Sequence, residues 1–489
     1  MIRIDPKPMY ELSPYLFMQF MEPLGTTDSS VEAAWDFQRD QWKPEFIEVI
    51  KELSPSMIRW GGILTSFWKW REGIGPRDRR IPMINYLWGG LESNQVGLHE
   101  YMDFCEQVGA EPLLGVNFSA DGRPEYINTV RGENRAGTPE EAAALVRYCN
   151  DPDDDLRKVN GKSEPWGIRF WQVGNETSYP KAGHRFTSEE SAKEFVKYAK
   201  AMRQVDPEIK LIGWGCKEGN RDAWWAPELL DIAGDQVDYV AAHMMCQGPR
   251  REDTILTGME YMKDRDRAWA ELLEIYDILE PRLLELEAII EEKGSDAKIA
   301  ITEGHLSLKP HNTCFLLHEW LAGLYHAKVL NLYQRHGDMV KIATLADFFG
   351  NRWTVNAVML GSPMQRMYLM PVGIICTFYR KHIGEYGVAV PSDLKGLDMA
   401  ISRTDNRLYL HVINGDLHRA NTVDISIEGH EVVGGCAYTI APGIDAYVDS
   451  ERRDTFAPEE TRVNPGDLIN WTFPGASVTV LELEIKPKE

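Results

Sequence analysis

Eight short, continuously apolar runs, each separated by a longer amphipathic stretch, constrain the fold of this chain more than any other feature. Runs of this kind are typical of parallel strands that are covered on both faces. They are Tyr15–Phe20, Met57–Trp60, Pro112–Phe118, Ile168–Val173, Leu211–Gly215, Val237–His243, Ile299–Thr302 and Val340–Leu345.

The stretches between these runs have the features of helices. Pro44–Leu53 opens with proline in its first turn, and Leu98–Val108 stops directly before Gly109. A further helix is expected to begin after the capping residue Thr138, and longer ones over 188–204, 257–293 and 316–336. Eight strands that alternate with helices predict an α/β fold, a (β/α)8 TIM barrel.

The pattern changes after about residue 385. Apolar stretches there are separated by Gly, Pro, Asn and Asp, and no helical pattern lies between them. We therefore predict a C-terminal β-sandwich appended to the barrel. The expected division is a (β/α)8 barrel over 12–384 and a sandwich over 385–489, joined by an N-terminal strand within 1–11.

Composition excludes several classes of partner. The net charge of −22, from 53 basic and 75 acidic residues, opposes binding to nucleic acid or to an anionic membrane. The seven cysteines are scattered and form no CxxC pair, which argues against a zinc cluster or a disulfide framework. Free thiols and the absence of an export signal predict a cytoplasmic location. Without a GxGxxG, Walker or HExxH pattern we expect no cofactor and no metal, and a neutral carbohydrate fits best.

Two of the apolar runs end in a glutamate. Asn175-Glu176 follows the fourth run, and Glu303 follows the seventh. Active sites of these barrels lie at the carboxyl ends of the strands, where strands four and seven face each other. Two converging carboxylates suit glycoside hydrolysis, in which one protonates the leaving oxygen and the other attacks the anomeric carbon or activates water. The alternative for either glutamate is a salt bridge in the barrel rim.

The Asn-Glu pair and the second glutamate resemble the large clan of retaining barrel glycosidases. Further stretches, in order along the chain, resemble the α-L-arabinofuranosidases of glycoside hydrolase family 51 within that clan. They are Phe20-Met21-Glu22, Arg59-Trp60-Gly61-Gly62, Trp70 to Pro76, Trp88 to Gly97, Gly109 to Asn117 and Trp166-Gly167.

This resemblance implies a retaining, exo-acting glycoside hydrolase, most like an α-L-arabinofuranosidase. In the family pattern Glu303 is the nucleophile, Glu176 is the acid/base, and Asn175 binds the hydroxyl next to the anomeric carbon. Glu22 would accept sugar hydroxyls, and Arg59 would orient Glu303 and keep it ionised. The resemblance also implies that Trp88 forms an apolar wall for the sugar and that Asn117 and His243 bind the substrate. For Glu22, Arg59, Trp88, Asn117 and His243 alike, the alternative is a role in packing or in ion pairs at the barrel rim. The substrate would be a glycoside or oligosaccharide, and the protein a homo-oligomer.

The chain also departs from the family pattern. Ile63 stands where the family has an asparagine, Met245 where it has a tyrosine, and Met370 where it has a glutamine. Gly304-His305 follows the nucleophile position, where the family has tryptophan. These changes alter the sugar pocket, so a glycosidase of the same clan with galactofuranose, xylose or glucose as its glycone stays an alternative. A carbohydrate-binding protein without turnover is the alternative from another class.

Overall fold

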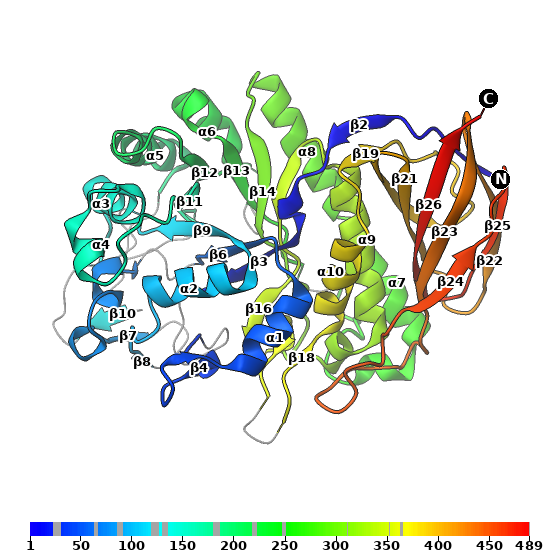
Figure 1. The fold of residues 1–489 in the computed structure, drawn as a ribbon, viewed down its shortest axis with the longest axis horizontal. Coiled ribbons are helices and arrows are strands. Elements are labelled where there is room, and N and C mark those ends of the chain that lie inside the picture. Colours follow the sequence, from blue (N-terminus) through cyan, green and yellow to red (C-terminus); the bar gives the residue numbers. More distant parts are fainter. Residues whose placement is uncertain are drawn as a thin grey trace.

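The chain forms a barrel beside a smaller all-β unit (Figure 1). The predicted fold class, a (β/α)8 barrel with a C-terminal β-sandwich, is confirmed. The computed structural model describes residues 1–22, 31–62, 67–85, 91–118, 127–129, 135–178, 186–217, 223–246, 251–310, 312–351, 353–361 and 365–488.

A curled sheet with the strand order β15-β14-β13-β12-β11-β9-β6-β3-β16-β17-β18 forms the barrel wall. The ring closes through β16 (Asp347–Gly350), which continues the chain beyond β15 and pairs with β3 at Phe20. The eight barrel strands are β3 (Met18–Met21), β6 (Met57–Trp60), β9 (Glu111–Val116), β11 (Phe170–Val173), β12 (Lys210–Trp214), β13 (Tyr239–His243), β14 (Lys298–Glu303) and β15 (Val340–Ala343).

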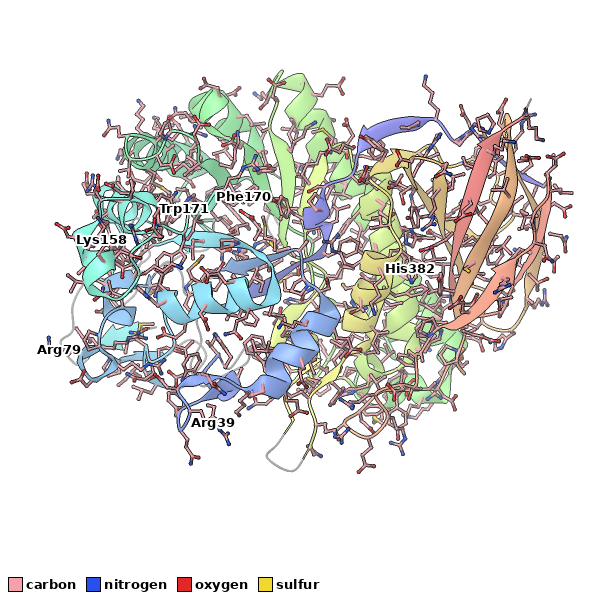
Figure 2. All side chains as sticks on the ribbon, viewed as in Figure 1. Arg39, Arg79, Lys158, Phe170, Trp171 and His382 are labelled. Atoms are coloured by element: carbon pink, nitrogen blue, oxygen red, sulfur yellow. The ribbon has the colours of Figure 1, made fainter. Side chains whose placement is uncertain are left out.

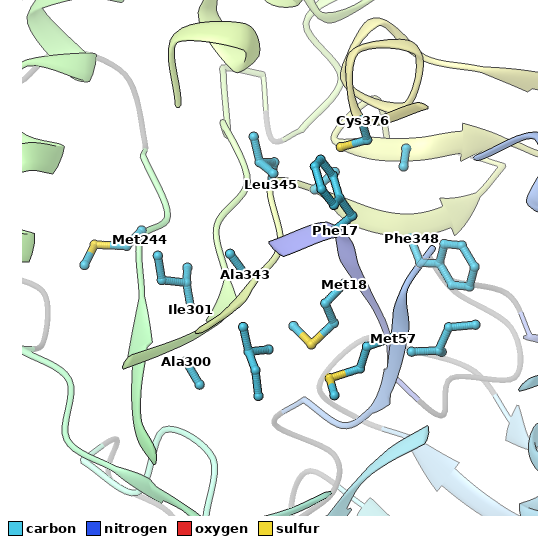
Figure 3. Packing of buried hydrophobic residues seen from close by; sticks show 14 of the residues in the cluster. Phe17, Met18, Met57, Met244, Ala300, Ile301, Ala343, Leu345, Phe348 and Cys376 are labelled. Atoms are coloured by element: carbon cyan, nitrogen blue, oxygen red, sulfur yellow. The ribbon is translucent and has the colours of Figure 1, made fainter. Parts of the chain in front are cut away.

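Apolar side chains from strands that are far apart in the sequence fill the barrel. Met18, Met57, Ile301 and Ala343 come from four neighbouring strands, are fully buried and gather in one cluster (Figure 3). The first strand begins later than its apolar run, because Pro14–Phe17 forms a 3-10 turn instead. Burying this continuous core provides the main drive for closing the ring.

Helices connect the strands and cover the outside of the barrel (Figure 1). The single helix predicted over 257–293 is wrong. Two helices form there: the Asp264 side chain accepts from the Arg267 backbone N–H and starts α7. That helix ends at Tyr276, and Pro281, which has no N–H to donate, lies in the first turn of a separate helix, α8. The helices are α1 (Pro44–Leu53), α2 (Leu98–Val108), α3 (Pro139–Asn150), α4 (Asp155–Val159), α5 (Ser188–Arg203), α6 (Ala226–Ala233), α7 (Arg265–Tyr276), α8 (Leu279–Glu292), α9 (Trp320–Arg335) and α10 (Pro371–Lys381).

Shorter strands lie in the connections of the barrel. Two of them, β17 and β18, extend the barrel sheet beyond β16, and the others pair into two small sheets. They are β4 (Trp35–Asp36), β5 (Gln41–Trp42), β7 (Met83–Asn85), β8 (Leu91–Glu92), β10 (Ile127–Thr129), β17 (Asn356–Met359) and β18 (Tyr368–Leu369). Among the described residues, none of the helices is long and apolar enough to cross a membrane.

The all-β unit consists of two sheets around a separate apolar core. The N-terminal residues belong to it, because β1 pairs with β22 and β2 pairs with β19. The division at residue 385 stays a prediction. The seven-stranded sheet contains β2 (Pro8–Glu11), β19 (Tyr386–Val388), β20 (Asp398–Thr404), β21 (Arg407–Asn414), β26 (Ser477–Pro487), β23 (His430–Ile440) and β24 (Glu459–Val463), and the three-stranded sheet contains β1 (Ile2–Ile4), β22 (Asn421–Ile427) and β25 (Ile469–Phe473).

Charged side chains join α9 to the first long strand of the sandwich. The Asp398 carboxylate lies 2.9 Å from Lys328 Nζ and 3.2 Å from Arg335 Nη1, and it accepts a hydrogen bond of 2.7 Å from the Asn331 amide. Farther along the same interface His382, labelled in Figure 2, lies 2.7 Å from a Glu482 oxygen. These contacts fix the sandwich against the helical layer of the barrel.

Replacing the acceptor at this interface should destabilise the protein. Asp398→Ala leaves two largely buried cations and one amide without their acceptor, which we expect to cost on the order of 2–3 kcal/mol. Calorimetry would measure this as a lower melting temperature. The matched control is Asp393→Ala, because the Asp393 carboxylate is exposed and pairs with an exposed lysine. Equal melting temperatures for the two variants would contradict the role of Asp398.

Candidate active site

The predicted site residues lie at the carboxyl ends of the barrel strands, an end that we call the mouth. Arg59 is in β6 and His243 ends β13, while Glu303 ends β14. Glu22 follows β3, Asn117 follows β9, and Asn175-Glu176 follows β11 after one glycine. Trp88, and the departure at Ile63, lie outside the described residues.

Arg59 is fully buried and connects three strands below the mouth. Its Nε donates to Gln172 Oε1 at 2.6 Å, and its Nη2 donates to Asn175 Oδ1 at 2.5 Å. Nη1 donates to Glu303 Oε1 at 3.1 Å and to the Thr302 carbonyl at 3.2 Å. A buried guanidinium is tolerated only when its donors are paired, so Arg59 holds β6, β11 and β14 in one arrangement.

Glu176 and Glu303 converge on His243. The His243 Nδ1 atom lies 3.0 Å from Glu176 Oε1 and 3.6 Å from Glu303 Oε2, and Nε2 lies 3.1 Å from Thr302 Oγ1. An oxygen of each glutamate lies within 4.8 Å of the other. Inverting glycosidases need roughly 6.5–9.5 Å between their carboxyl groups, whereas retaining ones use about 5–5.5 Å. The observed spacing suits retention.

The turn that carries the first glutamate is strained. Glu176 has a φ of 48°, in a region that residues other than glycine rarely adopt. Gly174, two residues earlier, has a φ of 88°, and a Cβ there would lie 2.8 Å from the Thr177 methyl group. Strain of this kind is concentrated at functional sites, where it aims a side chain. Here it accompanies the turn of Glu176 toward His243.

The Gly61-Gly62 pair fits tightly between two charged groups of the site. A Cβ on Gly61 would lie 2.8 Å from Arg59 Nε, and one on Gly62 would lie 2.5 Å from Glu22 Cδ. Gly62 also has a φ of 134°, which favours glycine. The glycine pair that follows Arg59 therefore allows Glu22 and the guanidinium to lie close to the same backbone.

Asn117 is oriented by the loops around it. Its amide nitrogen donates to the Arg135 carbonyl at 2.7 Å and to the Trp68 carbonyl at 3.2 Å. Its Oδ1 is buried and has no hydrogen-bond partner within the described part of the chain. The amide group thus packs against loops, while the oxygen stays available to a bound hydroxyl; its role in binding stays a prediction.

Burial dominates the electrostatics of the site. It raises the pKa of Glu303, and the negative charge of Glu176 acts in the same direction. His243 and Arg59 lower the pKa of Glu303, but the net direction is upward. From the sequence we expect Arg59 to keep Glu303 ionised. The guanidinium does favour the ionised form, but burial outweighs it. Burial also lowers the pKa of His243 to about 4, so the imidazole is neutral near pH 7.

Among the described residues, Glu176, His243 and Glu303 form one group of three potential metal ligands. Two carboxylates and an imidazole are ligands that a divalent transition metal accepts. The Arg59 guanidinium, 3.1 Å from Glu303, already places a positive charge beside this group.

Several residues that contact the predicted site residues were not predicted from the sequence. Gln172 accepts from Arg59 and lies three residues before Asn175, whereas Thr302 contacts His243 and directly precedes Glu303. The edge of Trp214 packs on the His243 ring at 4.7 Å between ring centres. Asp347 lies 2.8 Å from His305 near the same mouth. An inward-facing polar residue in an otherwise apolar strand was the available signal for Gln172 and Thr302.

The methionines near the site belong mostly to the core. Met244, Met367 and Met370 are buried in the main apolar cluster of the barrel, whereas Met245 is half-buried. The buried side chain of Met370 therefore takes no polar role at the family's glutamine position.

The fold is a (β/α)8 barrel, and the oxygens of two carboxylates approach within 4.8 Å at its mouth. Residues 49–265 match the family described as "Alpha-L-arabinofuranosidase 1 domain". The "Intracellular exo-alpha-(1->5)-L-arabinofuranosidase" of Acetivibrio thermocellus is 28% identical over 333 residues, which cover 63% of this chain and 60% of the relative. The "Exo-alpha-(1->6)-L-arabinofuranosidase" of Bifidobacterium longum is 31% identical over 249 residues, 48% of this chain and 44% of the relative.

Solved structures agree in fold over nearly the whole chain. The α-L-arabinofuranosidase of Thermotoga maritima, in an arabinose complex, superposes with a TM-score of 0.81 at 24% identity, covering 99% of both chains. The GH51 arabinofuranosidase of Xanthomonas axonopodis superposes with a TM-score of 0.81 at 20% identity, also covering 99% of both chains. These matches confirm the resemblance to the family 51 arabinofuranosidases that the motifs indicate. The chain spans about three fifths of the length of the Acetivibrio relative and less than half of the Bifidobacterium one.

The neutral state of His243 should appear in the pH dependence of stability. A pKa of about 4 in the folded protein lies below the unfolded value of about 6.5, so the unfolded state binds the additional proton between these limits. The stability that the neutral imidazole contributes is present above about pH 6.5 and is lost as the pH falls through about 4, a difference on the order of 3 kcal/mol. His243→Gln should therefore flatten the decline of the melting temperature between pH 6.5 and 4.

Thermal unfolding of the variant and the native protein across this pH range measures the effect. His418→Gln is the matched control, because His418 is exposed on the sandwich. If His243→Gln and His418→Gln show the same pH dependence as the native protein, the buried neutral state of His243 is refuted.

Proposed function

We propose that this protein is a retaining, exo-acting glycoside hydrolase, most like an α-L-arabinofuranosidase. The observation that carries the proposal is the pair of Glu176 and Glu303, whose oxygens approach within 4.8 Å beside His243. The relatives named as exo-arabinofuranosidases support the same class of reaction and the same glycone. A glycoside or oligosaccharide is the proposed substrate.

The two carboxylates have different neighbours, which suits two roles. Glu303 lies 3.1 Å from the Arg59 guanidinium, which partly offsets the effect of burial on its pKa and so supports the negative form that attacks the anomeric carbon. Glu176 lies beside a neutral imidazole and donates its proton to the leaving oxygen. The bond from the anomeric carbon to that oxygen breaks as the bond to Glu303 forms.

Water completes the reaction in a second step. Glu176, now ionised, takes a proton from a water molecule that attacks the anomeric carbon and releases Glu303. Arg59 accounts for the orientation of Asn175, because it donates to the Asn175 oxygen at 2.5 Å and so directs the amide nitrogen elsewhere. That amide can then donate to the sugar hydroxyl next to the anomeric carbon, a contact that strengthens in the transition state.

Chromogenic substrates test this proposal directly. Across a panel of nitrophenyl furanosides and pyranosides we expect one glycone to be cleaved, with α-L-arabinofuranoside first. Glu303→Ala should abolish cleavage, and Glu176→Ala should lose at least about 10²-fold in kcat, because general acid catalysis contributes that much. A control variant at an exposed glutamate of the sandwich, Glu484→Ala, should keep the activity, since Glu484 pairs with the exposed Arg407. Cleavage that persists in Glu303→Ala would refute the assignment.

The pH profile separates the charge of Arg59 from its hydrogen bonds. Glu303 must be ionised to attack, and removing the cation raises its pKa further. Arg59→Gln should therefore move the acid limb of kcat/KM to higher pH by about one unit or more. Arg59→Lys keeps the charge, so the limb should stay near its native position, while kcat falls because one ammonium cannot replace the planar fork. An unmoved acid limb in Arg59→Gln would contradict this role.

The second candidate is a glycosidase of the same clan with another glycone. It is favoured by the methionines at 245 and 370, which offer no hydroxyl or amide to the sugar. Cleavage of a galactofuranoside, xyloside or glucoside in the same panel would select it. A carbohydrate-binding protein without turnover would bind sugar while every glycoside stays intact.

We further propose a cytoplasmic homo-oligomer. Two relatives are named intracellular, and all seven cysteines of this chain are free thiols, five of them buried. Free thiols persist in a reducing compartment. The assembly of several copies follows from the family resemblance alone.

A further inference from the structure

The three residues at the centre of the mouth are also arranged as ligands of a metal ion. His243 Nδ1 lies 3.0 Å from Glu176 Oε1 and 3.6 Å from Glu303 Oε2, and one ligand atom of each residue lies within 4.8 Å of the other two. All three residues are buried. The proposed hydrolysis uses the glutamates as proton donor and nucleophile, so the capacity of this group to bind a cation is a separate property.

The spacing of these atoms fits a zinc ion. Zinc binds an imidazole nitrogen at about 2.0–2.1 Å and a carboxylate oxygen at about 2.0–2.2 Å, so in tetrahedral geometry two ligand atoms are about 3.3–3.5 Å apart. The two distances from His243 Nδ1, 3.0 and 3.6 Å, lie on either side of this range. The two glutamate oxygens, within 4.8 Å of each other, reach the same separation when their side chains rotate by a small amount.

The groups behind His243 suit coordination through Nδ1. Its Nε2 lies 3.1 Å from Thr302 Oγ1, so Nε2–H can donate to the hydroxyl and leave the lone pair of Nδ1 directed at the two glutamates. Histidines that bind metals are held in this way by an oxygen on their other ring nitrogen. The edge of Trp214, 4.7 Å away between ring centres, packs on the imidazole and restricts its rotation.

The Arg59 guanidinium leaves room for a cation beside it. Its Nη1 donates to Glu303 Oε1 at 3.1 Å, whereas Oε2 is the oxygen that faces His243. Glu303 can therefore contact Arg59 and a metal ion through different oxygens. When both glutamates are ionised, their two negative charges outnumber the one guanidinium that touches Glu303, so the group attracts a cation.

We propose that Glu176, His243 and Glu303 bind a divalent transition metal ion such as zinc, and that the bound ion inhibits the hydrolysis. Three protein ligands leave a fourth position for water. The ion holds one oxygen of each glutamate, so Glu176 no longer donates a proton and Glu303 no longer attacks. Magnesium and calcium are poor ligands of this site, because they prefer six or more oxygens to an imidazole. The binding is independent of the proposed function, whereas the inhibition rests on it.

Titration calorimetry with zinc chloride tests the binding without any substrate. We expect one zinc ion of high affinity per chain, and no heat of binding with magnesium chloride. Thr302→Val keeps the shape of the side chain but removes the hydroxyl behind His243, so the affinity should fall about 10- to 100-fold. His243→Ala and Glu303→Gln each remove a ligand and should lose more than about 100-fold, beyond the loss that a supporting residue causes.

The matched control is His336→Ala. His336 also faces two glutamates, but its Nδ1 lies 2.8 Å from Glu287 Oε1 and its Nε2 lies 3.4 Å from Glu280 Oε1. Because the two carboxylates face different nitrogens of the ring, they do not share one ion through it, and this variant should keep the zinc affinity of the native protein. Glu176→Gln serves as a further ligand variant in case His243→Ala does not fold, with a loss of affinity expected.

Kinetics test the inhibition. On the nitrophenyl glycoside that the native protein prefers, zinc should inhibit at the concentrations at which it binds in calorimetry, and EDTA should restore the full rate. Metal and substrate compete for the same groups, so zinc should raise KM and leave kcat unchanged.

Two results would overturn the metal site. One is a native protein that binds no zinc, and the other is zinc binding that His243→Ala and Glu303→Gln leave unchanged. Zinc that binds through these residues without inhibiting an active protein would overturn the inhibition. None of these results affects the proposed function if the native protein cleaves a glycoside and Glu303→Ala does not. If zinc binds as expected but no glycoside is cleaved, the metal site stands and the proposed function falls.

Discussion

The site depends on the burial of one guanidinium. Arg59 lies below the mouth without exposure to solvent and donates to Gln172, Asn175 and Glu303. A buried cation destabilises the protein unless its hydrogen-bond donors are satisfied. Removing one partner of such a buried ion pair costs about 3–5 kcal/mol. The second, fourth and seventh strands of the barrel are therefore held to a common geometry, and the chemistry of Glu303 is linked to the stability of the barrel.

This constraint also gives the two glutamates different environments. Glu303 shares the guanidinium, whereas Glu176 shares a histidine that burial keeps neutral. Two carboxylates whose oxygens approach within 4.8 Å repel each other, and that repulsion raises the pKa of Glu303 together with burial. The barrel core supplies the stability that such an arrangement requires, and the strained φ of Glu176 is a second local cost of the same site.

Local patterns predicted the elements of the barrel more reliably than their details. The apolar run Met57–Trp60 coincides with β6, and the capped segment Pro44–Leu53 coincides with α1. Prediction failed over 257–293, because Asp264 and Pro281 both fit the surface pattern of one long helix, yet Asp264 caps α7 and Pro281 lies in the first turn of the separate helix α8. The electrostatic expectation for Glu303 failed in part for a related reason, since the sequence named its cationic neighbour but gave no measure of burial.

The sequence by itself determined the fold class and placed Glu22, Asn117, Asn175, Glu176, His243 and Glu303 at the mouth, because parallel strands in a barrel bring their carboxyl ends together whatever their separation along the chain. It also determined the catalytic pair that we propose, Glu176 and Glu303. Only the tertiary structure decided their spacing and the place of His243 between them. Distances and burial arise from contacts between strands that are remote in sequence, and these depend on how the whole barrel packs.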